Sequence, residues 1–437
     1  MELTSRPSLS PVTSEADVAV VGAGAAGIAA ARRLCAAGLT VVVLEARDRV
    51  GGRAVTVCLK GHPVDLGAHW LHAGPINPLV RLGRSRGEPL RRAPVDGHLV
   101  VKGRAAGRTE RMRLDHAFAM ADRAMSMAAT RTEDCPAASA LPPLGPWGRH
   151  VAKIYGLVSG RPLGEVSLHD FQSMEYADNL FIAGGLGAYL ARLANGLPIR
   201  LGASVRSIDW SGAAVRIEGN MGTIRAKAVV VTAPIAVLRR GAIRFTPDLS
   251  AEIQDAIGGF IDGVYEHVVL HWPASPFRGA DRLATLAGGR HEPPGMLTSI
   301  DGTPFHFFEL DSELARRLDG KGPEGAARFA REVLRQHFGN RALTGLSVPA
   351  VTGWRHDPEA LASWAVVPPG RYAIRDILKE PIGDRIWFAG EALSRAQWGT
   401  VGGAWEEGER AADAIIGRLR GRSSPRLAGA GANRPPA

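Results

Sequence analysis

Three glycines and one carboxylate near the start of the chain have the types and spacing of a dinucleotide-binding site. Gly22, Gly24 and Gly27 form G-x-G-x-x-G, and Glu45 follows roughly twenty residues later. In such a site the first glycine permits a tight turn, the second lets a pyrophosphate approach the backbone, and the third lets a helix pack against a strand. Glu45 can accept hydrogen bonds from ribose hydroxyls, and it would repel a 2′-phosphate.

The residues around this pattern predict the elements that position it. Asp17 to Val21 and Leu39 to Leu44 are apolar runs of strand length, and the alanine-rich stretch Ile28 to Ala37 predicts a helix that ends at Gly38. The helix N-terminus offers free backbone N–H groups to phosphates. Because strand, turn, helix, strand and acid occur in order, we predict dinucleotide binding rather than a structural unit without a ligand.

The segment ARDRVGGR, which follows Glu45, favours FAD over NAD. Gly51 and Gly52 permit close backbone approach, and Arg53 supplies a charged fork for pyrophosphate. A Gly-Gly-Arg segment right after the ribose acid recurs in FAD proteins. The later segment GGLGAYL, from Gly184, is not framed by a strand and an acid, so we predict no NADPH site.

A second glycine-rich junction stands near the other end of the chain. Arg385 to Ala389 predicts a strand, Gly390 and Glu391 predict a turn, and Gly399 to Gly403 opens a helix that continues through Ile416. The positive end of a helix dipole suits the anionic edge of a reduced flavin.

With both ends in view, the chain resembles the flavin-containing amine oxidases, which comprise monoamine oxidases, polyamine oxidases and flavin-type histone lysine demethylases. The resemblance covers most of residues 17–420 and is more specific at the FAD motifs than in the substrate half. The segments that carry it are Gly22–Glu45, Gly51–Arg53, DLGAHWLH at Asp65–His72, GGLGAYL from Gly184, AVVVTAPI from Ala228, and FAGEA…GTVGGAW at Phe388–Trp405.

The resemblance implies an α/β fold with a Rossmann-like FAD-binding domain of the glutathione-reductase type and an interleaved α+β substrate domain. We expect residues 17–76, 184–240 and 370–420 in the FAD-binding domain, and residues 77–183 and 241–369 in the substrate domain. Residues 1–16 are expected to form a flexible leader, and residues 421–437 a disordered tail.

The resemblance also implies the FAD contacts. Glu45 matches the ribose acid, Val205 the residue whose backbone meets the adenine, Glu391 the contact near the ribityl chain, and Val401 the backbone donor to the flavin edge. The full set is Gly22, Gly24, Ala26, Gly27, Glu45, Ala46, Arg47, Gly52, Arg53, Gly67, Ala68, His69, Trp70, Val205, Gly390, Glu391, Thr400 and Val401.

The substrate side is implied by two further segments. In LASWAVVPPG, Trp364 matches the first aromatic beside the amine, and a slip of one residue would put Ser363 there; a core tryptophan is the alternative. The second aromatic position falls on Thr400, as in demethylase-like members. His72, in HWLHAG, is expected beside the flavin rather than in a surface loop. Ala362 and Ser363 stand where monoamine oxidases carry a flavin-linked cysteine, so we expect non-covalent FAD.

His267 occupies the position of the family's lysine, which holds a water near flavin N5 and assists the reaction with dioxygen. In the strand YEHVVLHWP, His267 and His271 lie on one face, while Val268 and Leu270 lie on the other. We expect His267 to face the flavin, where a neutral imidazole can hold such a water. A satisfied core histidine is the alternative, and the missing lysine also leaves open a dehydrogenase or a degenerate member.

The function that the resemblance implies is oxidation of a small-molecule amine. Hydride passes to flavin N5, the imine is hydrolysed, and dioxygen or another acceptor reoxidises the flavin. The alternatives are an FAD-dependent desaturase or oxidase of a non-amine substrate, and a non-enzymatic FAD-binding protein. Glu175, Asp178 and Glu309 are acidic candidates for the amine, without a spacing argument behind them.

Composition bounds the remaining classes. The 437 residues suggest two domains, and no apolar run has the length of a membrane-spanning helix. Three widely spaced cysteines predict neither a disulfide framework nor a zinc site, and they fit a cytoplasmic protein. The net charge of +10 lies partly in the tail and between Arg81 and Arg113. Without interleaved aromatic residues this charge indicates a solvated face rather than a nucleic-acid site, and it does not attract polyamines.

Overall fold

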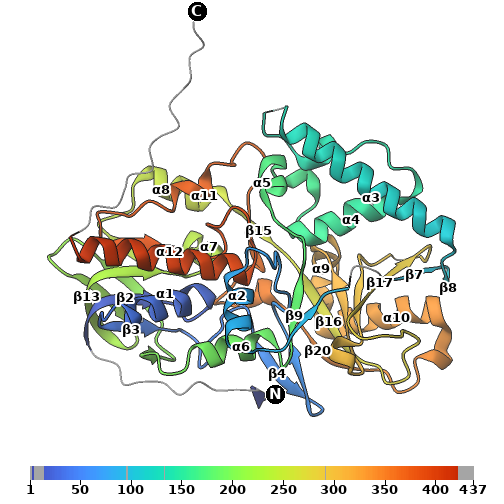
Figure 1. The fold of residues 1–437 in the computed structure, drawn as a ribbon, viewed down its shortest axis with the longest axis horizontal. Helices are drawn as coiled ribbons and strands as arrows, with labels where there is room; N and C mark the ends of the chain where they lie inside the picture. Colours follow the sequence, from blue (N-terminus) through green and yellow to red (C-terminus); the bar gives the residue numbers. More distant parts are fainter. Residues whose placement is uncertain (1, 4–13, 95–96, 132, 291, 422–437) are drawn as a thin grey trace, which may run out of the picture.

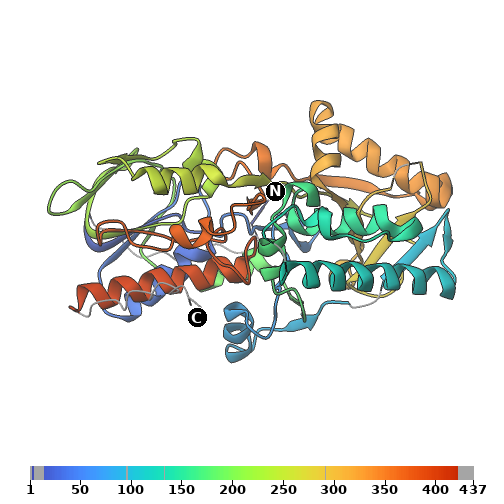
Figure 2. The ribbon, with the colours of Figure 1, turned by 90° about the horizontal axis from the view of Figure 1, so that it is seen from above.

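Two large β-sheets organise the molecule, one on each side of the view in Figure 1. The computed structural model describes residues 2–3, 14–94, 97–131, 133–290 and 292–421. Each sheet collects strands from distant parts of the sequence, so the chain passes repeatedly from one side to the other (Figures 1 and 2).

The first sheet has eight strands in the order β10-β3-β2-β13-β12-β11-β14, with β22 also beside β13. β10, β3, β2, β13 and β22 are parallel to their neighbours in this set, whereas β11, β12 and β13 form an antiparallel meander. The bounds are β2 Glu15–Val21, β3 Val41–Leu44, β10 Ile199–Arg200, β11 Val205–Asp209, β12 Val215–Gly219, β13 Gly222–Val231, β14 Arg244–Thr246 and β22 Ile386–Phe388.

Both faces of this sheet are covered, which explains why its parallel strands are continuous apolar runs. Val18 and Val20 of β2 pack on the side of α1 and α12, whereas Ala19 and Val21 pack on the side of α7 and α8. The helices are α1 Ala25–Ala36, α6 Leu186–Leu193 and α12 Val401–Leu419 on one side, and α7 Ile235–Arg239, α8 Ala251–Gly259 and α11 Ile374–Ile377 on the other.

Helix α12, near the C-terminal end of the described chain, lies along α1, the first helix (Figure 1). Their backbones approach closely, because a Cβ atom added at Gly408 would lie 2.1 Å from the carbonyl oxygen of Ala26. Arg33 of α1 and Asp413 of α12 form a surface ion pair at 2.6 Å. This packing places the N-terminus of α12 near the N-terminus of α1.

The second sheet has seven strands in the order β20-β16-β19-β18-β17-β7-β8. Val268 and Leu270 of β16 pack beneath α10, whereas Val269 packs on the opposite face with Phe307 and the hairpin of β4 and β5. The bounds are β4 Thr56–Leu59, β5 His62–Asp65, β7 Gly97–Val101, β8 Arg104–Ala105, β16 Glu266–His271, β17 Arg282–Ala287, β18 Met296–Thr298, β19 Phe305–Leu310, β20 Ser347–Val351, α9 Ser312–Leu318 and α10 Gly322–Ala342.

A helical layer lies beside the second sheet, at the upper right of Figure 1. It contains α3 Arg108–Ala129, α4 Gly148–Ser159 and α5 Leu168–Ser173. Two small ribbons and one further helix join the layers: β6 Leu90–Arg92 with β9 Leu180–Ile182, β15 Ile261–Gly263 with β21 Trp364–Val366, and α2 Pro78–Ser85 against α12. Single 3₁₀ turns are η1 Ala137–Ala140, η2 Gly145–Trp147, η3 Leu163–Glu165, η4 Ile300–Gly302, η5 Asp319–Lys321 and η6 Trp354–His356.

The structure differs from the expected segment boundaries at three places. β14 pairs with β11, and α8 packs on the first sheet, so residues 244–259 lie with that sheet rather than with the substrate half. β7 crosses in the other direction and completes the second sheet. Glu2–Leu3 forms β1 against β4, and β2 already begins at Glu15, so the expected leader is partly strand. Its residues 4–13 and the tail from residue 422 lie outside the described residues.

Within the described ranges, none of the helices combines the length and the apolar character that a membrane crossing needs.

Candidate active site

A cavity of about 1100 Å³ is lined by residues from both sheets. Cavities that hold drug-sized ligands measure about 300–1,000 Å³, so this one has room for a large cofactor and a substrate. One part of its wall comes from the loops after β2 and β3 and from the start of α12. Another part comes from Tyr265, just before β16, and from Glu309 of β19.

The start of α1 is built to receive an anion. Gly24 is the N-cap residue and supplies no side-chain cap, and the first turn contains no acidic residue. The N–H groups that open a helix have no intrahelical partner, so those of Ala25 and Ala26 are available to a phosphate. A Cβ atom at Gly52 would lie 3.3 Å from the Cα of Gly24, so the backbones of these two glycines pass close to each other at the cavity.

Gly27 does not line the cavity, unlike the other predicted FAD contacts. A Cβ atom there would lie 1.9 Å from the carbonyl oxygen of Gly22. The third glycine therefore allows α1 to pack on the turn, as the motif predicts, but it does not itself contact a ligand in the cavity.

Glu45 is buried at the end of β3, with 5% of its surface exposed. Its carboxylate accepts hydrogen bonds from the N–H groups of Ala23 at 2.6 Å and Arg47 at 2.9 Å. Burial raises the pKa of Glu45, and these hydrogen bonds partly offset the shift. Arg47 is in turn held by a two-pronged ion pair with Asp357.

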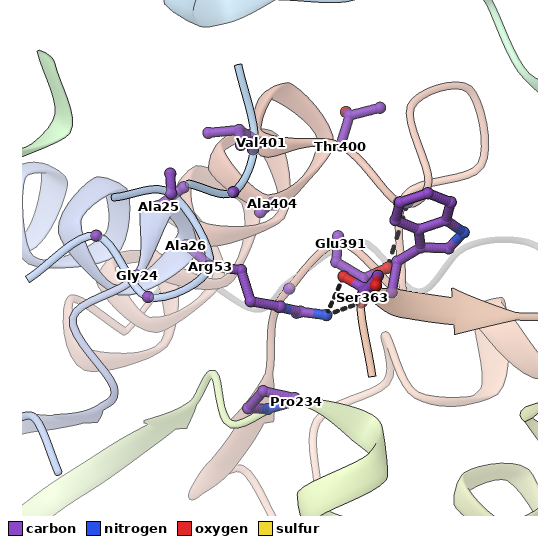
Figure 3. Close-up of a pocket in the computed structure, with 18 of the residues that line it drawn as sticks. Gly24, Ala25, Ala26, Arg53, Pro234, Ser363, Glu391, Thr400, Val401 and Ala404 are labelled. Carbon is purple, nitrogen blue, oxygen red and sulfur yellow. Dashed lines mark hydrogen bonds and ion pairs between the residues drawn. The ribbon is translucent and has the colours of Figure 1, made fainter. Parts of the chain in front are cut away.

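Arg53 joins the first and last segments of the site (Figure 3). Its Nη1 donates to the carbonyl oxygen of Ser363 at 2.9 Å and to Glu391 Oε1 at 3.1 Å. Glu391 also accepts from the N–H groups of Ala365 and Gly399. The guanidinium is expected to be a charged fork for pyrophosphate, and in the structure its Nη1 is engaged within the protein.

The start of α12 presents a second set of free N–H groups to the cavity (Figure 3). Thr400 is the N-cap; its hydroxyl accepts from Gly403 N–H at 3.0 Å and donates to Gln397 C=O at 2.7 Å. No acidic residue occupies the first turn, so the positive end of the helix faces the cavity uncompensated. The other predicted FAD contacts that line the cavity are Gly22, Ala46, Gly67, Ala68, His69, Trp70, Val205, Gly390 and Val401.

Two pairs of aromatic rings line further parts of the cavity. Trp364 stacks on Tyr265 with ring centroids 6.0 Å apart, and its indole N–H donates to Ser159 C=O at 2.8 Å. His72 stacks on Tyr176 at 4.7 Å and bonds to Asn179. Burial lowers the pKa of His72 to about 4, so this imidazole is neutral at neutral pH.

The two sequence alternatives for residues 363 and 364 both reach the cavity, with different partners. The hydroxyl of Ser363 accepts a hydrogen bond from Tyr265 N–H and donates one to Tyr265 C=O, just before β16. The ring of Trp364 instead lines the cavity. The structure therefore favours Trp364 as the aromatic surface.

His267 does not line the cavity, so the prediction that it faces the flavin is not supported. It is 1% exposed and packs against Phe307 at 4.2 Å and His69 at 5.8 Å. His69, which contacts the His267 ring, lines the cavity instead. The position of the loop that carries His69 is not encoded in the strand pattern around His267. Burial lowers the pKa of His267 well below 6.5, so the ring is neutral.

The hydrogen bonding of His267 is incomplete. Both of its ring nitrogens, His69 Nε2 and the Tyr265 hydroxyl are buried without a well-formed hydrogen bond among the described residues, although the backbone of Asp65 approaches the His267 ring. Buried polar atoms without protein partners are usually satisfied by ordered water. This cluster therefore marks a polar spot in the cavity wall, where His69 and Tyr265 line the cavity and His267 does not.

Glu309 is one of the three acidic candidates for the amine that sequence reasoning could not rank. It lies opposite His267 in the β16–β19 pair, it is 6% exposed, and it lines the cavity. Burial raises its pKa to about 7. The signal was present in the sequence, because Glu309 is the only acid in the strand FHFFEL, whose residues are all buried.

A fully buried ion pair supports the loop that leads into α12. Arg375 holds Asp170 with two hydrogen bonds of 2.7 Å, and both side chains are inaccessible to solvent. Trp398, which lines the cavity, lies under the Arg375 guanidinium at 5.0 Å and donates to Asp170 C=O. Among the described residues, no group of three or more His, Cys, Asp or Glu side chains is arranged to hold a metal ion.

The sequence matches one protein family and several of its characterised members. A family model described as flavin containing amine oxidoreductase matches residues 25–122 and 141–416. Lysine-specific histone demethylase 1B of Mus musculus is 29% identical over 444 residues, covering 91% of this chain and 52% of that protein. Polyamine oxidase 2 of Arabidopsis thaliana is 29% identical over 443 residues, covering 92% and 88%.

A solved structure of a putrescine oxidase redesigned at its cofactor site has the same mixed α/β fold. The TM-score is 0.73 at 19% identity, over 94% of this chain and all of that chain. The chain spans about half the length of the demethylases it matches, 52% to 54% for the first four.

Proposed function

The chain belongs to the flavin containing amine oxidoreductases, and we propose on this premise that it oxidises the carbon–nitrogen bond of a small-molecule amine. The observation that carries the proposal is one cavity with two kinds of lining. The helices α1 and α12 both begin at this cavity without an acidic residue in the first turn, and aromatic side chains line other parts of it. FAD is the cofactor of this family, and when bound it accepts two electrons from the amine.

The residues present fit FAD. The start of α1 and the Gly24–Gly52 contact suit its diphosphate, and Glu45 suits a ribose. The first sheet, with its helices on both faces, supports a Rossmann-like FAD-binding domain of the glutathione-reductase type. In this assignment the second sheet and α3 to α5 form the interleaved substrate domain. None of the three cysteines, all of which the structure describes, lines the cavity, and this supports non-covalent binding.

The chain's own groups would orient the amine and keep the cavity dry. Trp364 and Tyr265 form one wall, and His72 and Tyr176 form another. His69 and His72 have pKa values lowered to about 4 by burial, so neither adds positive charge beside a cationic substrate. The start of α12, from Thr400, would stabilise negative charge on a bound flavin through its partial positive charge. After electron transfer, water hydrolyses the imine product.

The electron acceptor in the second half-reaction is proposed to be dioxygen or another acceptor. The family's lysine is replaced by His267, which lies behind His69. The neutral polar cluster of His69, Tyr265 and His267 is the nearest equivalent in this chain, and its reaction with dioxygen is expected to differ from that of a lysine site. The cytoplasm is proposed as the location, in keeping with three unpaired cysteines.

An anaerobic screen of the FAD-loaded protein tests this function. Primary, secondary and polyamine substrates, a methylated lysine peptide and apolar non-amine compounds are mixed with the protein, and loss of flavin absorbance is followed. Bleaching by an amine supports the proposal without requiring dioxygen as acceptor. Bleaching only by non-amine compounds would refute amine oxidation and support an FAD-dependent desaturase or oxidase of a non-amine substrate. No bleaching by any compound would favour an FAD-binding protein without turnover.

A further inference from the structure

The loop of residues 389–400 joins β22 to α12 and forms part of the cavity wall. Glu391, near its beginning, and Thr400, at its end, both lie on that wall (Figure 3). Trp398, which lies between them in the sequence, also lines the cavity. The position of this loop therefore decides the shape of the cavity beside the start of α12.

The loop is fastened to α5, which belongs to the helical layer beside the second sheet. Trp398 Nε1–H donates to Asp170 C=O in α5 at 3.0 Å. The N–H group of Glu175, just after α5, donates to Ala396 C=O in the loop at 2.8 Å. A part of the wall that follows the first sheet in the sequence is therefore held by a helix from the other half of the molecule.

Arg375 of α11 connects the same two elements. Its guanidinium makes two hydrogen bonds of 2.7 Å to the Asp170 carboxylate and donates to Ala392 C=O in the loop at 2.6 Å. The rings of Trp398 and Phe260 lie against the guanidinium, with centroids 5.0 and 5.6 Å from its central carbon. The indole of Trp398 is thus fixed at two points, because its face meets the cation and its N–H meets Asp170.

The residues next to Trp398 join it to other groups of the cavity. Gly399 N–H donates to Glu391 at 3.2 Å, and a Cβ atom at Gly399 would lie 3.2 Å from the ring of Trp364. Nη2 of Arg375 lies 3.5 Å from the carbonyl oxygen of Ala365, the residue after Trp364. A displacement of Arg375 would therefore reach the backbone on both sides of this wall.

Stability alone is a weak reason to bury such an ion pair. Well-packed apolar side chains in its place are often as stable or more stable, although removal of one partner alone is costly. Apolar side chains do not supply direction, whereas a guanidinium fork binds a carboxylate in one orientation and stacks on aromatic rings. Arg375 uses both properties, and the ring of Trp398 that it holds lines the cavity. This favours a role in positioning over one in stability alone.

We propose that Arg375 is a positioning residue for the flavin site, which acts together with Asp170 by fixing the indole of Trp398 in the wall where the flavin binds. Neither charged side chain lines the cavity, so both act through the residues that they hold. The inference rests on the proposed function only for the place of FAD in this cavity, and it is independent of which amine is oxidised.

The test uses the full chain loaded with FAD and compares Arg375→Lys, Arg375→Met, Trp398→Phe and the double variant Arg375→Lys/Trp398→Phe with wild type. The absorbance and circular dichroism of the bound flavin are recorded in the visible range, and titration gives the Kd for FAD. Arg375→Lys keeps a positive charge beside Asp170 but lacks the fork, so it separates position from charge.

The matched control is Arg395→Met. Arg395 belongs to the same loop, forms an ion pair with Asp376 of α11 and lies 4.0 Å over the ring of Tyr372. It is half-buried, and neither Arg395 nor its two partners lines the cavity. This variant therefore removes an arginine with similar contacts from the outer side of the loop.

The expected result is a changed visible circular dichroism spectrum of the flavin in Arg375→Lys and Arg375→Met. The Kd for FAD rises by about 2- to 10-fold, as for the loss of one hydrogen bond. Arg395→Met keeps the wild-type spectrum and Kd. In the Trp398→Phe background, Arg375→Lys raises the Kd further by less than about twofold, because residues that act through one another are not additive.

A wild-type spectrum and Kd in Arg375→Lys would overturn the proposal, and so would an equal change in Arg395→Met. A full additional effect of Arg375→Lys in the Trp398→Phe background would refute action through Trp398. Where Arg375→Met does not fold, Arg375→Lys decides the outcome. None of these measurements needs an amine, so they still decide on Arg375 if no amine bleaches the flavin and amine oxidation is refuted.

Discussion

Replacing Glu309 by glutamine is expected to stabilise the protein at alkaline pH. Burial raises the pKa of Glu309 from 4.5 to about 7. Each pKa unit corresponds to about 1.4 kcal/mol, so the charged carboxylate costs the folded state about 3 kcal/mol. Glutamine keeps the shape of the side chain and removes the charge, so this cost disappears.

The sign of the pH dependence follows from proton binding. Between pH 4.5 and about 7 the unfolded chain has lost this proton while the folded chain still holds it. Stability therefore falls as the pH rises through this window, and the contribution is constant below and above it. Wild type and Glu309→Gln should be equally stable near pH 4.5, and the variant should be more stable by up to about 3 kcal/mol at pH 8.

Urea unfolding of the FAD-loaded protein at pH 4.5 and pH 8, without amine, measures this difference. The matched control is Glu266→Gln. Burial also raises the pKa of Glu266 to about 7, but its carboxylate accepts hydrogen bonds from Thr352 and Arg355 and does not line the cavity. Glu266→Gln loses part of this bonding, so it should gain less at pH 8. An equal stability difference for Glu309→Gln at both pH values would refute the reasoning.

Three further predictions concern the glycine turn, the buried ion pair and the two histidines. Gly24→Ala should weaken FAD binding without unfolding the protein, because its Cβ would meet nothing closer than 3.9 Å. Gly27→Ala should also destabilise the fold by about 1–3 kcal/mol. FAD titration and urea unfolding distinguish the two variants, and equal losses of stability would contradict the packing role of Gly27. Arg375→Met should cost about 3–5 kcal/mol in urea unfolding, because Asp170 is left charged and buried, and a loss below about 1 kcal/mol would contradict this. His69→Ala should change the rate of flavin reoxidation by dioxygen more than His267→Ala does, with His271→Ala as the control on the same strand, and the reverse order would contradict the layering of these rings.

The glycine turn and the acid that follows it could be placed from the sequence because their determinants are local. The turn at Gly22 to Gly27 and the acid at Glu45 lie within one strand–helix–strand unit, and their residue types suffice to identify it. The helix begins at Ala25 rather than Ile28, since Gly24 serves directly as its N-cap.

The substrate half was less predictable because its walls are assembled across long sequence distances. Tyr176 stacks on His72 and Tyr265 on Trp364, and no local pattern encodes either pair. The strand pattern gave the correct face for His267, but it could not show that the loop carrying His69 covers that ring. Glu309 acquires its environment only through strand pairing with His267 and the approach of Tyr176.

The most direct measurement is a crystal structure of the FAD-loaded protein, prepared without oxygen in the presence of an amine. The account predicts the FAD diphosphate at the start of α1, the flavin between Trp364 and the start of α12, and the amine beside the wall formed by Trp364 and Tyr265. A flavin or an amine bound outside this cavity would contradict it.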